Sequence, residues 1–298
     1  MLPQIDRLFA EPGVTDVVFN NFAAVLQKSQ GRWSAAAPQF ASEEAFADWL
    51  IDLVESAGGR LDYQNPATSV RLGDYRLHAV LGVGIAPNSS ATIRKLATDE
   101  TELQFSDVLS ILRLHQIQAQ LSGGVNVLIA GAAGSGKTSL LRHLLRQVEN
   151  QRIITIEDTP ELSLGTPNSV SLHSRQSNNE GVGEILLNRL VFESLRMSPD
   201  RIALGEIRGP ELFTLLEALN TGHCGGGATI HANSLEAVVT RLSGIASSAG
   251  VSERTLALQV LDAFGLVVYL SADPNHRIDA VGRFILEADK LKVQRVEL

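Results

Sequence analysis

The sequence is poor in cysteine, in aromatic residues and in long apolar runs. Its 298 residues include one cysteine, and 5% of them are aromatic. A single cysteine cannot form a disulfide within the chain or a zinc site of four thiolates, so we expect a reducing compartment. No apolar run approaches the roughly 18 to 20 residues that a membrane-spanning helix needs. The first residues, MLPQIDRLFAEPG, lack a basic stretch followed by an apolar one, so we expect no secretion signal.

The chain also lacks an excess of positive charge. Its net charge is −8, with 8 Lys and Arg against 14 Asp and Glu in residues 1–112, and 17 against 19 in residues 113–298. Neither part has the basic surplus that is typical of nucleic-acid-binding domains, so we expect no nucleic acid as a partner. The 44% of hydrophobic residues is enough for one large or two modest globular domains with apolar cores.

The patterns that are present predict two domains. Over residues 1–105, short apolar strands surround one amphipathic helix, which begins after an N-cap at Ser42 and ends at Gly58-Gly59, and this indicates a small α+β domain. Over residues 106–298, buried strands such as VNVLIA, RIITIED, DRIALGE and GATIHA alternate with amphipathic helices. That alternation is typical of an α/β fold with a mostly parallel sheet and helices on both faces. The C-terminal stretch from Gly265 predicts antiparallel strands at a sheet edge.

The strongest motif is GAAGSGKT, Gly131 to Thr138, which matches G-x-x-x-x-G-K-[ST] at every fixed position. An apolar strand precedes it and a helix follows it. Glycines let such a loop wrap around phosphates, and the helix N-terminus directs N–H groups at them. Lys137 is expected to reach the β- and γ-phosphates, and Thr138 to bind Mg²⁺. The expected nucleotide-binding residues of the loop are Gly131, Ala132, Ala133, Gly134, Ser135, Gly136, Lys137, Thr138 and Ser139.

Acidic residues follow two of the predicted strands. Glu206 ends the strand in DRIALGE, where the acid of a Walker B motif would lie. Glu157, Asp158 and Glu161 come at the end of the strand in IITIED or soon after it. Because the carboxyl ends of parallel strands meet at one edge of the sheet, these acids would converge beside the phosphate-binding loop. Glu157 and Asp158 are also candidate Mg²⁺ ligands.

Residues 220–234, NTGHCGGGATIHANS, raise three alternatives: a metal site, a thiol nucleophile or a histidine beside a ligand. His223 and His231 lack a third metal ligand at a usual spacing, and Cys224 lacks a neighbouring base that would favour its thiolate. GATIHA predicts a short buried strand, so His231 at its end would face the same edge as the phosphate-binding loop. The three glycines are expected to give room for a tight turn and a close backbone approach.

In this order, the segments resemble the ATPases of the secretion superfamily, the hexameric motors of type II and type IV secretion, type IV pili and archaeal flagella. IITIEDTPEL, NNEGVGEI, LRMSPDRIALGEIRGPE and LNTGHCGGGATIHANS carry the likeness, which covers nearly the whole chain. They are most similar to the branch of tight-adherence (Flp-type) pili. The resemblance implies a RecA-like P-loop ATPase domain over 106–298 after a PAS-like α+β domain over 1–105.

The resemblance also implies roles for single residues. The catalytic residues would be Glu161, Glu206, His231, Arg94 and Arg76. Glu161 and Glu206 would position the attacking water, and His231, with His223 in support, would contact the γ-phosphate. Arg94 and Arg76 would reach the phosphates from the N-terminal domain. The turn that ends at Arg76 departs from the family pattern, because the usual Asp-Gly-Ser-Arg reads Gly-Asp-Tyr-Arg in this sequence. Arg208 would take part in subunit contacts.

The implied protein is a homo-hexameric, Mg²⁺-dependent ATPase at the cytoplasmic face of the membrane. It would hydrolyse ATP to power pilus assembly or protein secretion through an inner-membrane platform protein, with no metal beyond Mg²⁺. Conjugation or type IV secretion is the alternative within the superfamily. Outside it, a RecA-like DNA-dependent ATPase and a nucleotide-binding regulator without hydrolysis stay open.

Overall fold

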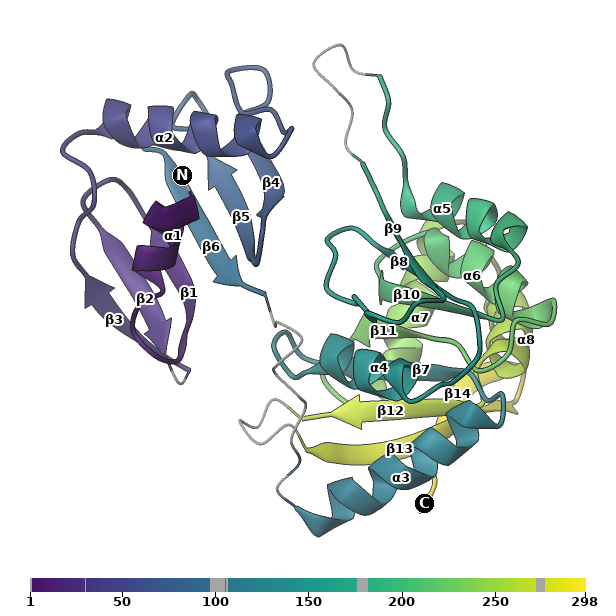
Figure 1. The fold of residues 1–298 in the computed structure, drawn as a ribbon. Coiled ribbons are helices and arrows are strands. Elements are labelled where there is room, and N and C mark those ends of the chain that lie inside the picture. The colour runs from purple at the N-terminus through teal and green to yellow at the C-terminus, as the bar shows by residue number, and fades with distance from the viewer. Residues whose placement is uncertain (1, 30, 97–104, 106, 176–181, 272–276) are drawn as a thin grey trace. The chain divides into compact units, whose positions relative to one another are not determined.

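The computed structural model describes residues 2–29, 31–96, 105, 107–175, 182–271 and 277–298. These residues form two compact units, of which the first holds elements α1 to β6 and the second holds α3 to β14 (Figure 1). The predicted boundary between residues 105 and 106 falls in the segment 97–106, of which only Phe105 is described, and residues 178–181 of NNEGVGEI also lie outside the described residues. Among the described helices, none has the length and hydropathy of a membrane span.

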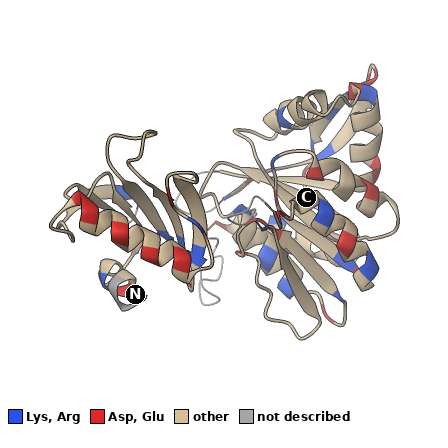
Figure 2. Ribbon diagram, turned by 90° about the horizontal axis from the view of Figure 1, so that it is seen from above, with Lys and Arg blue, Asp and Glu red and all other residues tan. Residues whose placement is uncertain are grey.

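The first unit is a six-stranded antiparallel sheet with two helices. Its elements are α1 (Leu2–Leu8), β1 (Val14–Phe19), β2 (Val25–Ser29), β3 (Arg32–Ala36), α2 (Glu43–Ser56), β4 (Ala67–Leu72), β5 (Tyr75–Val80) and β6 (Ser90–Lys95). The strand order is β3-β2-β1-β6-β5-β4. As predicted, Ser42 caps α2, its hydroxyl accepting the Ala45 N–H at 3.3 Å. The apolar face of α2 packs on the sheet through contacts such as Phe46 with Phe19, and its exposed face carries the acidic residues drawn in red in Figure 2.

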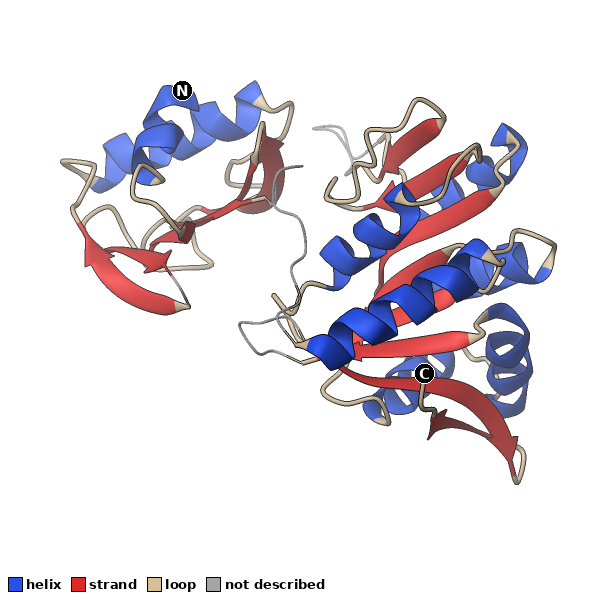
Figure 3. Ribbon diagram, turned by 60° about the horizontal axis from the view of Figure 1, so that its bottom comes forward, coloured by secondary structure: helices blue, strands red, loops and turns tan. Residues whose placement is uncertain are grey.

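The second unit is an eight-stranded sheet with helices on both faces (Figure 3). Its helices are α3 (Val108–Ser122), α4 (Lys137–Arg146), α5 (Leu187–Ser194), the 3-10 turn η1 (Leu195–Met197), α6 (Glu211–Asn220), α7 (Ala237–Ser248) and α8 (Glu253–Ala263). Its strands are β7 (Val127–Gly131), β8 (Ile153–Glu157), β9 (Ser169–His173), β10 (Arg201–Ile207), β11 (Gly227–His231), β12 (Leu266–Leu270), β13 (Ile278–Glu287) and β14 (Lys290–Arg295). The order is β14-β13-β12-β7-β11-β10-β8-β9.

The central strand β7 shows how the two faces are covered. All five of its residues are buried. Leu128 and Ala130 belong to the core that includes α5 to α8, whereas Val127 and Ile129 belong to the core that includes α3 and α4. Successive side chains of a strand point to opposite faces, so a strand buried on both faces is apolar throughout. The predicted α/β fold with a mostly parallel sheet is therefore confirmed.

The prediction for the C-terminal stretch is wrong in its first strand. β12 runs parallel to β7, because the helices α7 and α8 return the chain to the edge at which β7 begins. β13 and β14 do form the antiparallel edge that was expected. Six strands, from β12 to β9 in sheet order, therefore end at a common carboxyl edge.

Candidate active site

The predicted phosphate-binding loop connects β7 to α4 at this carboxyl edge. Gly136, at φ 90°, precedes the first turn of α4 and has no side chain to cap it. A Cβ on Gly131 would lie 2.5 Å from Ser135 Oγ and 2.6 Å from the Leu270 carbonyl oxygen. The glycines thus permit a tight curl of the backbone, and the N–H groups of the helix start are available to an anion.

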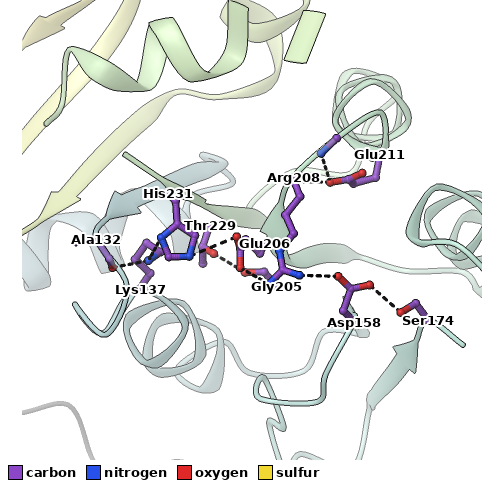
Figure 4. A network of polar contacts seen from close by, with 11 residues as sticks. Ala132, Lys137, Asp158, Ser174, Gly205, Glu206, Arg208, Glu211, Thr229 and His231 are labelled. Carbon is purple, nitrogen blue, oxygen red and sulfur yellow. Dashed lines mark hydrogen bonds and ion pairs between the residues drawn. The ribbon is translucent and has the colours of Figure 1, made fainter. Parts of the chain in front are cut away.

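Lys137, the first residue of α4, turns back onto its own loop. Its Nζ donates to the Ala132 carbonyl oxygen at 2.7 Å and lies 3.4 Å from Nδ1 of His231 (Figure 4). Burial lowers the pKa of Lys137 to about 8, although the charges of Glu206 and Glu161 oppose that shift. Glu161 therefore lies close enough to Lys137 for its charge to act on the ammonium group.

His231 connects the phosphate-binding loop to Glu206. It ends β11, and its Cα pairs in register with that of Gly131 at the end of β7. Because the ammonium group of Lys137 can only donate, Nδ1 of His231 is an acceptor and Nε2 carries the proton that faces Glu206 Oε1 at 3.3 Å. Burial and the charge of Lys137 lower the pKa of His231, which favours this neutral form at pH 7.

Arg208 joins the acids of two neighbouring strand ends. Its Nη2 donates to Glu206 Oε2 at 2.9 Å, and its Nη1 donates to Asp158 Oδ2 at 3.2 Å. The Ser174 hydroxyl completes the row by donating to Asp158 Oδ1 at 2.7 Å. One chain of polar contacts thus runs from Lys137 to Ser174 in the strand order β7-β11-β10-β8-β9 (Figure 4). Within one polypeptide, Arg208 contacts the carboxylates of Glu206 and Asp158. Its expected role in contacts between subunits stays a prediction.

The cations around Glu206 keep its carboxylate ionised. Burial raises the pKa of Glu206, but the hydrogen bond from Arg208 and the charges of Arg208 and Lys137 bring it below its ordinary value. An ionised carboxylate offers only acceptors. The end of β10 therefore presents a fixed acceptor beside the phosphate-binding loop.

The three acids of the predicted cluster, Glu157, Asp158 and Glu161, have different surroundings. Asp158 belongs to the Arg208 contacts. Glu161 is half-buried and acts electrostatically on Lys137. Glu157 is 4% exposed, and its carboxylate accepts hydrogen bonds from backbone N–H groups of the loop that follows β8. The carboxylates of Asp158 and Glu161 thus act on charged groups at the edge, whereas that of Glu157 binds backbone of its own loop.

Comparison with known proteins assigns this architecture. The family model described as type II/IV secretion system protein matches residues 71–282. The chain belongs to this family. A Mycobacterium tuberculosis protein with the provisional name of a conjugal transfer protein is 31% identical over 303 residues, covering 98% of this chain and 86% of the relative. The type IV secretion system protein VirB11 of Bartonella quintana is 41% identical over 119 residues, 40% of this chain and 33% of the relative.

A solved structure of the same superfamily shares the fold. The X-ray structure of the Legionella pneumophila ATPase DotB has a TM-score of 0.60 and 20% identity, covering 99% of this chain and 77% of that chain. The expected membership of the secretion superfamily and the RecA-like fold are confirmed. The relatives are named for conjugal transfer and type IV secretion, which favours the alternative expectation over the tight-adherence branch.

The two arginines that the family resemblance singles out are neighbours in the first unit. Arg76 of β5 and Arg94 of β6 pair directly across the sheet. Arg94 is 54% exposed, and its Nε donates to Asp16 Oδ1 at 2.7 Å. Their reach to the phosphates stays a prediction, because they belong to the first unit and the phosphate-binding loop to the second.

His223 lies at the opposite edge of the sheet from His231. It precedes β11, whereas His231 ends that strand. Its Nδ1 contacts the Ala218 carbonyl oxygen at 2.9 Å, near the end of α6. The chain therefore does not bring His223 to the phosphate-binding loop, and the expected support of His231 is absent from this geometry. The same separation argues against a zinc site shared by the two histidines.

The three glycines of this stretch admit their neighbours at the amino edge, as predicted. A Cβ on Gly227 would lie 2.6 Å from the Val127 carbonyl oxygen, and one on Gly226 would overlap the Ile202 carbonyl oxygen. A Cβ on Gly225 would overlap the guanidinium of Arg201. These residues therefore set the spacing between strands.

Sequence reasoning missed Arg201 and Glu211, which hold backbone at the two edges. Arg201 is 2% exposed, and its Nη1 donates to the carbonyl oxygens of Leu121 and Gly225 at 2.6 and 2.5 Å. Glu211 is 7% exposed and accepts the N–H groups of Arg208 and Gly209 at 2.5 and 2.7 Å. The Pro-Glu pair after Gly209 is a helix-start signal that would have identified Glu211. No local pattern identifies Arg201.

Proposed function

We propose that this protein is an Mg²⁺-dependent ATPase whose hydrolysis of ATP drives conjugation or type IV secretion. The observation that carries the proposal is the chain of contacts that links Lys137 through His231 and Glu206 to Arg208 beside a phosphate-binding loop. The names of the relatives support transfer or secretion as the process. Tight-adherence pilus assembly, the first expectation from the sequence, has less support.

The side chains at the carboxyl edge can bind the phosphates of ATP and orient the attacking water. Lys137 exchanges the Ala132 carbonyl for the β- and γ-phosphate oxygens. Glu206, ionised and held on one oxygen by Arg208, accepts a hydrogen bond from the attacking water on the other. When Lys137 changes its partner, His231 transmits the change to Glu206, because its two ring nitrogens face Lys137 and Glu206. Glu161 adds negative charge on the side of Lys137.

The oxygen donors at the edge fit Mg²⁺. The Thr138 hydroxyl, in the first turn of α4, and the carboxylates of Glu206 and Glu161 are the hard ligands that Mg²⁺ prefers. Bound Mg²⁺ neutralises charge on the phosphates. Asp158 is less suitable because Arg208 and Ser174 occupy its two oxygens. Glu157 is less suitable because backbone N–H groups occupy both of its oxygens.

We also propose the assembly that the family resemblance implies. Six copies would form a ring at the cytoplasmic membrane face, with an inner-membrane platform protein as partner. In the ring, Arg94 and Arg76 would complete the phosphate contacts, in their own subunit or in its neighbour. Sizing the protein with and without a nonhydrolysable ATP analogue tests this, and a monomer at micromolar concentration in both conditions contradicts it.

Phosphate release by purified protein with Mg²⁺ and ATP tests the activity. Lys137→Ala and Glu206→Gln should each lower kcat about 100- to 1,000-fold while the protein stays folded, because each removes a charge placed at the reacting phosphates. Glu217→Gln, on the exposed face of α6, is the matched control and should be silent. A wild-type rate in Glu206→Gln would refute the assignment of the water-orienting acid. Strong stimulation by single-stranded DNA would favour the DNA-dependent alternative.

Deletion of the gene in its host tests the process. Conjugative transfer or substrate secretion should be lost, and wild-type protein should restore it where the Lys137→Ala variant does not. Intact transfer combined with a loss of surface pili would instead support tight-adherence pilus assembly.

A further inference from the structure

Glu157 is the buried member of the acidic cluster, and its carboxylate accepts backbone N–H groups. It ends β8 with 4% exposure. The Glu161 N–H lies 3.1 Å from both carboxylate oxygens, and the Leu162 N–H lies 2.9 Å from both. A carboxylate offers acceptors on both oxygens, whereas an amide would present donors on one side. The site thus selects a carboxylate by its hydrogen-bonding pattern.

The loop that Glu157 holds has no regular structure of its own. Residues 158–166 form neither helix nor strand. Leu162 anchors the loop on one side, because its side chain is fully buried in the core with α4. The Glu157 carboxylate fixes the adjoining N–H groups. Glu161, between these anchors, is thereby kept where its charge acts on Lys137.

Gly205 on the neighbouring strand β10 provides the space for Glu157. A Cβ at position 205 would lie 2.7 Å from Glu157 Cγ, which is closer than real side chains approach, and 3.0 Å from its Oε1. The Thr229 hydroxyl donates to the Gly205 carbonyl oxygen and holds that backbone from the other side (Figure 4). Gly205 directly precedes Glu206, so one strand seats both the structural and the water-orienting acid.

We propose that Glu157 is a positioning residue: its carboxylate, seated against Gly205, fixes the backbone of Glu161 and Leu162 and so holds the Glu161 carboxylate at the phosphate site. Glu157 acts through backbone and not as a ligand of Mg²⁺. The kinetic consequence rests on the proposed ATPase activity, whereas the structural consequence does not.

Amide hydrogen exchange of the nucleotide-free protein tests the structural part. In Glu157→Gln the Glu161 and Leu162 amides should exchange at least about tenfold faster, because one of the two oxygens that each N–H faces is replaced by an NH2 donor. Gly205→Ala should have the same effect, since it displaces the carboxylate without removing it, and it carries the test should Glu157→Gln not fold. Gly244→Ala, in the middle of α7 with nothing within 4 Å of the new methyl group, is the matched control. Unchanged exchange in Glu157→Gln and Gly205→Ala would overturn the proposal.

Steady-state kinetics separates positioning from metal binding. Glu157→Gln and Gly205→Ala should lower kcat about tenfold or more, with the KM for ATP and the half-saturating Mg²⁺ concentration within twofold of wild type. In a Glu161→Gln background both changes should have little further effect, because Glu157 acts through Glu161. A raised Mg²⁺ requirement in Glu157→Gln alone would identify a metal ligand and refute positioning. An inactive wild type would refute the ATPase instead and leave the exchange result to decide this proposal.

Discussion

The two edges of the large sheet each hold an arginine, and the two arginines bind different kinds of partner. At the carboxyl edge, Arg208 contacts the side chains of Glu206 and Asp158. At the amino edge, Arg201 gives its Nη donors to backbone carbonyls. Ion pairs between partly exposed side chains can exchange partners when a ligand binds, whereas Arg201 is 2% exposed and holds the backbone of two segments. For these two arginines, the kind of partner distinguishes a group that can act at the phosphate site from one that stabilises the fold.

The largest effect that we expect is on stability at the amino edge. Arg201→Met leaves buried carbonyl oxygens without donors and should lower the free energy of unfolding by about 3 kcal/mol or more. Activity per folded molecule should stay within twofold of wild type. Arg196, exposed and paired with Glu193, is the control, and Arg196→Met should cost less than about 1 kcal/mol. Denaturant unfolding and phosphate release measure both, and a loss of activity without a loss of stability would break the comparison between the edges.

Arg208 should show the opposite profile. Arg208→Ala should lower kcat about 10- to 100-fold by releasing Glu206, and should change the free energy of unfolding by no more than about 1 kcal/mol because the pair is partly exposed. Arg208 lowers the pKa of Glu206, so its loss should move the acid limb of the pH–rate profile to higher pH. Arg208→Lys keeps the charge but loses the two parallel N–H donors of the guanidinium, so its kcat and its acid limb should lie between those of wild type and Arg208→Ala. An unmoved acid limb in Arg208→Ala would contradict the proposed electrostatic role.

Nucleotide affinity should report the pKa of Lys137, which is about 8 in the free protein. Bound phosphates raise that pKa, so below about pH 8 the lysine is protonated in both states and affinity is flat. Above about pH 8 binding must take up a proton, and the Kd should rise up to about tenfold per pH unit. Titration of a fluorescent ADP analogue between about pH 7 and pH 9.5 measures this. A flat Kd in wild type, or a slope that survives in Lys137→Arg, would argue against Lys137 as its source.

The smallest effects should come from His223 and Cys224. Since both precede β11 at the amino edge, His223→Ala and Cys224→Ser should leave kcat and KM within twofold of wild type. His223→Ala loses the contact with the Ala218 carbonyl and should cost about 1 kcal/mol of stability. A marked rise in the KM for ATP in His223→Ala would show that another subunit brings this histidine to a nucleotide.

Sequence predicted the parts of the site that follow from strand direction. The phosphate-binding loop was identified by its motif, and Glu206 and His231 end parallel strands, so they had to share its edge. The same logic places His223 away from this edge. It is a neighbour of His231 in the motif, but β11 stands between them and places them at opposite edges. Residues of one motif are near each other along the chain, but a single strand between them can place them at opposite edges of a sheet.

The residues that escaped sequence reasoning have distant or backbone partners. Arg201 contacts the carbonyl of Leu121, which is 80 positions away. Glu157 resembled its acidic neighbours in the sequence, and only the structure shows that its oxygens face N–H groups. Because every residue carries a C=O group and every residue except proline an N–H group, no side-chain pattern marks such partners.

The one cysteine, which we expect to have no part in the chemistry, has a practical value. Cys224 is free and exposed, and no other thiol occurs in the chain. A maleimide dye would therefore attach at one site of the native sequence, at the sheet edge away from Lys137. A second thiol introduced at the exposed position of Asp52 on α2 would give a donor–acceptor pair spanning the two units. Energy transfer between the dyes would then report, in real time, any change in the distance between the units when nucleotide is bound and hydrolysed.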